Sequence, residues 1–205
     1  MDFYSVIEKR RTVRRFTGEA VDEAALRRIL QAGLCAPSND HLRQWEFVVL
    51  RDRENIARVL GMVAEQGKMQ QEALKSRPLT DSQKKMYDHA VPSQYKMLAE
   101  ADCLILPFFK PNADVLHPAA LQQLNSIASV WCCIENILLA AAAEGLGCSL
   151  RIPTGDEWQY AARAAGAPEG YLLPCYLGLG HPDPKEALPK QHPVSLEEKL
   201  HLEKW

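Results

Sequence analysis

The fold class follows from residues 121–153, LQQLNSIASVWCCIENILLAAAAEGLGCSLRIP. Apolar residues recur there at helical spacing, which predicts one long helix. They are Leu121, Leu124, Ile127, Val130, Ile134, Ile137, Leu138 and Ala141. The helix is apolar on more than one face, which is typical of a central helix buried in a core or at a subunit interface. Gly145 and Gly147 end it, and residues 148–152 predict a short strand.

Three further strands are predicted outside this stretch. WEFVVL at 45–50 is rich in β-branched and aromatic residues, and CLILPFF at 103–109 has the continuous apolar character of a buried strand. Pro107 indicates an end or an irregularity in the latter. A fourth strand is predicted over 171–179. Strands separated by helices indicate an α/β or α+β protein and not a helical bundle.

Helices are predicted before and between these strands. Phe3, Val6 and Ile7 share one face of an N-terminal helix that runs into a basic cluster. A second helix begins at the N-cap candidate Asp22 and is stopped by Pro37. Residues 53–93 are polar and helix-prone, which favours a mobile or solvent-facing excursion, and another helix is predicted near 155–165.

Bulk composition favours one domain. The chain has 205 residues with 47% hydrophobic content, enough for one substantial core. We therefore expect a single domain over residues 1–205, with an extended tail over about 182–205 that carries four prolines and docks elsewhere. The net charge of -2 gives no general attraction to nucleic acid or to an anionic membrane.

Localisation and metal binding are judged from the apolar runs and the cysteines. No apolar run approaches the roughly 20 residues of a membrane span, and the charges of the N-terminus follow its apolar residues, the reverse of a secretory signal. A cytoplasmic protein is expected. The six cysteines form no CxxC motif and no Cys/His cluster with ligand spacing, so we expect buried, reduced thiols and no metal site.

The basic cluster after the first helix is the main candidate binding feature. Arg10, Arg11, Thr12 and Arg14 together offer forked cationic donors and a hydroxyl to a compact dianion such as a phosphate. The alternative is a solvated basic helix end, which the helix dipole favours. A nucleic-acid patch is disfavoured because no aromatic platform accompanies the cluster.

Four segments in order resemble the nitroreductase family. KRRTVRRF at 9–16 and APSNDHLRQWEFVVL at 36–50 are similar to the family's RRSxRxF-like and APSxxNxQPWxF segments. AAAEGLGCSLRIP at 141–153 resembles the end of the family's long helix, and LGLGHPDPKEALPKQHP at 177–193 resembles its final strand and tail. The resemblance implies an α+β fold with a central, mostly antiparallel sheet flanked by helices. It also implies a homodimer with the long helix at its interface.

The same resemblance implies an FMN site built from both chains. Its predicted cofactor-binding residues come from four segments: Arg10, Arg11, Thr12 and Arg14; Pro37, Ser38, Asn39 and His41; Leu150, Arg151 and Ile152; Lys190 and His192. The first set would hold the phosphate and the ribityl chain. The second would pack on the flavin from the partner subunit, and backbone groups of the third would face the flavin N5 edge. The fourth would reach the phosphate, with His192 in place of an arginine.

The chain departs from the family pattern at several of these positions. His41 and Arg43 stand where the family has an asparagine and the glutamine of its Gln-Pro-Trp sequence. Pro153 lies where a backbone N–H donor is wanted and cannot supply one. For Arg151 two interpretations remain, a cation that stabilises the reduced flavin and a solvent-exposed arginine at a strand end.

The resemblance implies an FMN-dependent oxidoreductase. It would transfer hydride from NADH or NADPH through the flavin to an electron-poor small molecule such as a nitroaromatic or a quinone. The alternative is a flavin-binding protein without turnover, either a cofactor reservoir or a redox-sensing module. No acid or base residue is assigned, and no nucleic-acid or membrane partner is expected.

Overall fold

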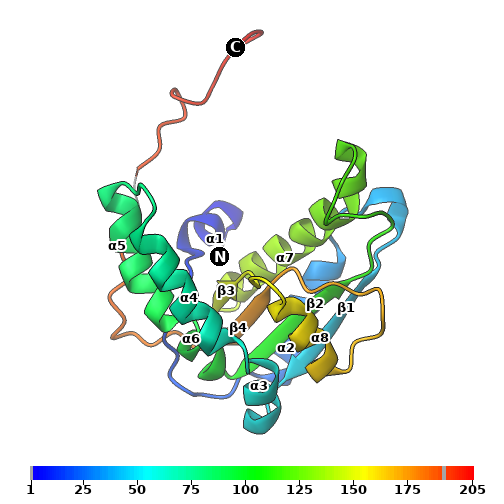
Figure 1. Cartoon of the computed structure of the whole chain (residues 1–205). Helices are drawn as coiled ribbons and strands as arrows, with labels where there is room; N and C mark the ends of the chain where they lie inside the picture. Colours follow the sequence, from blue (N-terminus) through cyan, green and yellow to red (C-terminus); the bar gives the residue numbers. More distant parts are fainter. Residues whose placement is uncertain (1, 191–192) are drawn as a thin grey trace.

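The sheet at the centre of the molecule is antiparallel. The computed structural model describes residues 2–190 and 193–205. Its strands β1 (Trp45–Leu50), β2 (Cys103–Phe109), β3 (Gly147–Arg151) and β4 (Tyr176–Gly180) form one four-stranded sheet in the order β1-β2-β4-β3. Every pair of neighbouring strands in it is antiparallel. The predicted α+β class and the antiparallel sheet are confirmed (Figure 1).

Helices cover both faces of this sheet (Figure 1). The α-helices are α1 (Phe3–Lys9), α2 (Glu23–Leu34), α3 (Arg53–Val59), α4 (Val63–Lys75), α5 (Asp81–Ala90), α6 (Lys96–Ala99), α7 (Asn125–Ala143) and α8 (Glu157–Ala165). Short 3-10 turns are η1 (Asn39–His41), η2 (Val91–Ser93) and η3 (Leu121–Leu124). All the predicted helices are present, and the polar segment 53–93 is largely helical.

Strand β2 contributes apolar side chains to both faces of the sheet, so each face is covered by its own apolar layer. Its residues alternate between the faces of the sheet, so Cys103 and Ile105 pack with α2 and α7, whereas Leu104 and Leu106 pack with α3, α6 and α8. All seven residues of β2 are buried. A strand covered on both faces reads as a continuous apolar run, which is how it was predicted.

Pro107 lies inside β2 and not at its end. Phe109 donates its N–H to Leu172, on the side of β2 away from β1, and alternation places the nitrogen of Pro107 on that same side. Pairing with β4 stops at Ile105, so no neighbouring strand requires an N–H from Pro107. The predicted strand over 171–179 was correct only in its second half, because Pro174 precedes the start of β4 at Tyr176.

Helix α7 is buried on one side only. It packs on α2 so closely that a Cβ at Gly33 would lie 2.8 Å from Ile137 Cγ1. Contrary to the sequence expectation, Leu121–Ala143 is long and apolar enough by length and composition to cross a membrane, a test that core helices of soluble proteins also pass. Only 28% of its apolar window is buried within this chain. Most of the other residues of the helix are half-buried, and Ala128, Cys132, Glu135 and Ala143 are exposed.

The cysteines confirm part of the expectation for free thiols. All six are unpaired, and burial raises the pKa of Cys103, Cys133 and Cys148 to about 12. Such thiols stay protonated and unreactive at neutral pH. Cys35 and Cys132, however, are exposed, because Cys35 is the C-cap that follows α2 and Cys132 lies on an outward-facing position of α7.

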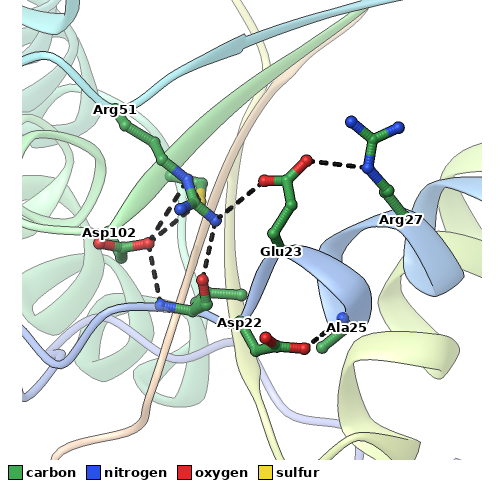
Figure 2. Close-up of polar contacts among 8 residues, drawn as sticks. Asp22, Glu23, Ala25, Arg27, Arg51 and Asp102 are labelled. Carbon is green, nitrogen blue, oxygen red and sulfur yellow. Dashed lines mark hydrogen bonds and ion pairs between the residues drawn. The ribbon is translucent and has the colours of Figure 1, made fainter.

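Arg51 connects the start of α2 to the sheet (Figure 2). Its guanidinium donates to the carbonyl of Val21 at 2.8 Å, and its nitrogens lie 3.8 Å from Glu23 and 3.9 Å from Asp102. Asp102 accepts the Val21 N–H at 3.0 Å. Arg27, in contrast, contacts only the exposed Glu23 among the residues drawn. The network fixes the segment that joins the basic cluster to α2.

The start of the C-terminal tail contacts the body of this chain, because Asp183 donates its backbone N–H to the carbonyl of Arg15 at 3.0 Å. The described part of the tail beyond residue 193 is exposed and projects from the body (Figure 1). Trp205 is 100% exposed and stacks only on His201, with ring centroids 4.5 Å apart. A turn lies within this part of the tail, where Lys199 and Leu200 both donate their N–H groups to the carbonyl of Leu196 at 2.9 Å.

Candidate cofactor-binding site

The basic cluster leaves α1 in an extended conformation and runs beside the sheet. Val13 donates its N–H to the carbonyl of Cys148 at 2.9 Å, and Thr12 pairs with Cys148 as an isolated parallel bridge. Val13 is buried against Gly147, where any Cβ would lie 2.5 Å from its methyl group. Because side chains alternate along an extended chain, burying Val13 turns Thr12 and Arg14 to the other side.

The tail crosses the basic cluster and is held there by specific contacts. The Arg11 guanidinium donates to the carbonyl of Pro189. Glu186 accepts the backbone N–H groups of Arg14 and Arg15 at 3.2 and 3.3 Å. These contacts bring Lys190 to the cluster from a position nearly 180 residues away in the sequence. The predicted site residue His192 lies outside the described residues.

A cavity of about 840 Å³ opens at this crossing. Half of the described residues that line it are cationic, and none of them is acidic. The lining consists of Arg10, Arg11, Thr12, Arg14, Ser82, Lys85, Met86, Pro189, Lys190 and Pro193. All four residues predicted from the basic cluster, together with Lys190, therefore face one space.

The electrostatics of this cavity favour an anion. The Nε of Arg14 is buried and, within residues 2–190 and 193–205, has no hydrogen-bond partner. Burial lowers the pKa of Arg14, Glu186 acts in the opposite direction, and Arg11 lowers it further. Glu135 lies 3.9 Å from Arg10, at the limit of an ion pair. A bound phosphate would satisfy the Arg14 donor and offset the repulsion between the arginines.

The predicted loop 37–43 lies elsewhere in the chain. The N–H of Asn39 donates to Ser129 Oγ at 3.0 Å, and its side-chain oxygen accepts from Asn125 at 3.2 Å. This places the loop at the start of α7, whereas Arg10 lies beside Glu135 further along the helix. At about 1.5 Å per helical residue, the six residues from 129 to 135 span roughly 9 Å. Within one chain, no described residue of the loop lines the cavity that contains the arginines.

The same loop has an unusual backbone. Asp40, His41 and Arg43 have φ values of 50°, 54° and 43°, in the left-handed region that disfavours side chains other than glycine, asparagine and aspartate. Such conformations persist where surrounding contacts impose them, and they cluster at ligand sites. Pro37 and His41 are exposed, and Ser38 and Asn39 are half-buried. The loop is thus fixed by its contacts with α7 and is exposed to solvent.

Both predicted roles of the Arg151 side chain, in the segment 150–152, are wrong. Arg151 is not an exposed arginine at a strand end, and its guanidinium is not free to face a cofactor. Its Nε and Nη2 donate to the two carboxylate oxygens of Glu157 at 3.0 and 2.7 Å, and the two side chains are 2% and 1% exposed. Only backbone groups of Leu150, Arg151 and Ile152 remain as candidates. None of the three lines the 840 Å³ cavity.

Sequence reasoning missed one wall of the cavity. Ser82, Lys85 and Met86 come from α5, in the segment that was treated as a solvent-facing excursion. Their spacing of i, i+3 and i+4 places them on one helical face. That spacing was visible in the sequence. Nothing in the sequence indicated that this face lies opposite the arginines.

Most of the chain matches the model of a known protein family. The model of the nitroreductase family matches residues 7–181. The chain belongs to the nitroreductase family. The match contains the basic cluster, loop 37–43 and residues 150–152, but it ends before Lys190. In this nitroreductase-family chain, the structure places Lys190, which lies beyond the matched residues, beside the arginines.

Relatives within the family carry more than one name. A "Putative NADH dehydrogenase/NAD(P)H nitroreductase" of Methanothermobacter thermautotrophicus is 27% identical over 100% of this chain and 88% of its own length. An iodotyrosine deiodinase of Thermotoga neapolitana is 26% identical over 93% of this chain and 95% of its own length. The solved structure of an FMN-dependent nitroreductase of Clostridium difficile has a TM-score of 0.72 and is 21% identical, over 98% of this chain and 99% of that chain. That last likeness shows the nitroreductase fold.

Proposed function

We propose that this protein is an FMN-dependent oxidoreductase that passes hydride from NADH or NADPH to an electron-poor small molecule such as a nitroaromatic or a quinone. The observation that carries the proposal is the convergence of cationic residues from both ends of the chain on one 840 Å³ cavity. A cavity of this size suits a cofactor-sized ligand. Within a chain of the nitroreductase family, FMN is the anion that fits.

The chain's own residues fit the phosphate end of FMN. Arg14 supplies a buried donor that lacks a partner among the described residues, and Arg11, already fixed to Pro189, supplies a second guanidinium. The Thr12 hydroxyl and the Lys190 ammonium add donors of different reach. When bound, the flavin supplies the hydride-transfer chemistry, and the protein orients it and shields it from water.

We further propose that the active form is a cytoplasmic homodimer. Within one chain, loop 37–43 and the arginines are separated along α7, so a second copy is needed to bring the loop of one subunit to the cavity of the other. Helix α7 provides a surface for that contact, because only 28% of its apolar window is buried in the single chain.

The names of the relatives support the class of acceptor. One relative is named for the reduction of a nitro compound with NAD(P)H, and another is named for the removal of iodine from iodotyrosine. The first name supports an electron-poor nitro compound as the acceptor that we propose for this chain, and the second supports a small-molecule substrate. No described residue of the cavity is a histidine, aspartate or glutamate, so we assign no acid or base.

A visible spectrum and an anaerobic titration test this function. The protein incubated with FMN and freed of excess ligand is expected to show flavin absorbance, to bleach on addition of NADH or NADPH, and to recover with a nitroaromatic or a quinone. Binding without bleaching by either nicotinamide would support the flavin-binding protein without turnover. A protein that stays colourless would contradict the proposal itself.

A further inference from the structure

We propose that Lys85 of α5 is a specificity-determining residue that binds an anionic group on the second ligand, the electron donor or acceptor, and not on the flavin. This inference rests on the proposed function. It concerns a helix that lies outside the basic cluster and outside the tail, and it names the chemistry of the substrate: a compound that carries a phosphate or carboxylate group in addition to its reactive part.

The helical face that carries Lys85 is directed into the cavity. Ser82, Lys85 and Met86 line it together, so the face offers a hydroxyl, an ammonium and an apolar thioether to one ligand. The adjacent Lys84 points elsewhere, because it lies 3.7 Å from Asp81 and lines a separate cavity between α4 and α5. Lys85 has no ion pair among the described residues.

The charge of the cavity exceeds what one phosphate requires. A phosphate monoester carries about -1.5 to -2 at neutral pH. Arg11, Arg14 and Lys190 supply three positive charges at the crossing of the basic cluster and the tail, and Arg10 adds a fourth, offset by Glu135. Glu186 offsets part of the Arg14 charge. Lys85 is a fifth cation on the opposite wall, which favours a second anion.

The packing of α5 suits a ligand that binds and dissociates in each catalytic cycle. Helix α5 continues directly into η2, on which α4 also packs, so this pair of helices is joined to the body through a short connection. Helices with few core contacts open at low free-energy cost. A resident cofactor is better held by the arginines, which hydrogen bonds to the sheet and the tail fix in place.

The test compares, in Lys85→Met, matched substrates of which one carries an additional anionic group, with Lys84→Met as the control. The donor arm uses NADPH and NADH, which differ by one phosphate. The acceptor arm uses 4-nitrobenzoate and 4-nitrobenzyl alcohol, which differ by one carboxylate. Both lysines are exposed, so neither change is expected to unfold the protein. FMN affinity is measured for each variant by fluorescence titration.

We expect Lys85→Met to lower kcat/KM by about tenfold for the member of at least one pair that carries the additional anionic group, the value of one charge-assisted contact. For the member without that group, kcat/KM should change less than twofold, as should the FMN dissociation constant, and Lys84→Met should behave as the wild type. Equal effects on both members of each pair would overturn the inference, as would a tenfold loss of FMN affinity. A wild-type protein that is not reduced at all would instead contradict the proposed function.

Discussion

Replacing Arg14 by methionine is expected to weaken FMN binding by about 2–4 kcal/mol, roughly 30- to 1,000-fold, because a buried charge-assisted contact is lost. Arg14 is the arginine of the cluster whose Nε is buried, and no partner for that nitrogen exists in the described part of the chain. Fluorescence titration of the flavin-free protein measures the effect.

Arg15 provides the matched control for this change. It is the next residue along the chain, but its side chain is 63% exposed and lies 3.7 Å from Asp183. Arg15→Met is expected to change FMN affinity by less than about 0.5 kcal/mol, as is usual for a surface ion pair. If both variants bind FMN like the wild type, the arginines are only a basic helix end, the alternative that the sequence left open.

Replacing Glu157 by alanine is expected to lower the free energy of unfolding by about 3–5 kcal/mol, because it leaves the buried guanidinium of Arg151 without a counter-charge. Both side chains are almost fully buried and joined through two hydrogen bonds. Glu157 also accepts the N–H and the hydroxyl of Thr154 at 3.3 Å. Urea denaturation followed by circular dichroism measures the loss.

The double variant Arg151→Met with Glu157→Leu separates the ion pair from general packing. Apolar residues of similar volume remove both charges together, so most of the stability lost in Glu157→Ala is expected to return. A single variant within about 1 kcal/mol of the wild type would show that the pair is not buried in solution.

Helix caps and buried strands were predicted correctly where the residues of the element itself determine its structure. Asp22 was predicted as the N-cap of α2, and its carboxylate accepts the Ala25 N–H at 2.9 Å. The continuous apolar run at 103–109 became a strand buried on both faces. In contrast, the start of β4 was placed too early, because apolar character at 171–175 was given more weight than Pro174.

Features that depend on tertiary contacts could not be predicted in the same way. Glu157 is six residues from Arg151, and only the turn between β3 and α8 brings the two side chains together. Lys85 and Lys84 are equivalent by composition, and the orientation of α5 alone decides which one faces the arginines. The basic cluster was identified from its residue types, but its meeting with Lys190 required the family resemblance.

Parallel titration of the flavin-free protein with FMN and with riboflavin tests the central claim most directly, because the two ligands differ only in the phosphate that we assign to the cationic cavity. We predict that FMN binds at least about 100-fold more tightly than riboflavin and that added salt reduces this difference. Equal affinities for the two flavins, or no binding of either, would contradict the account.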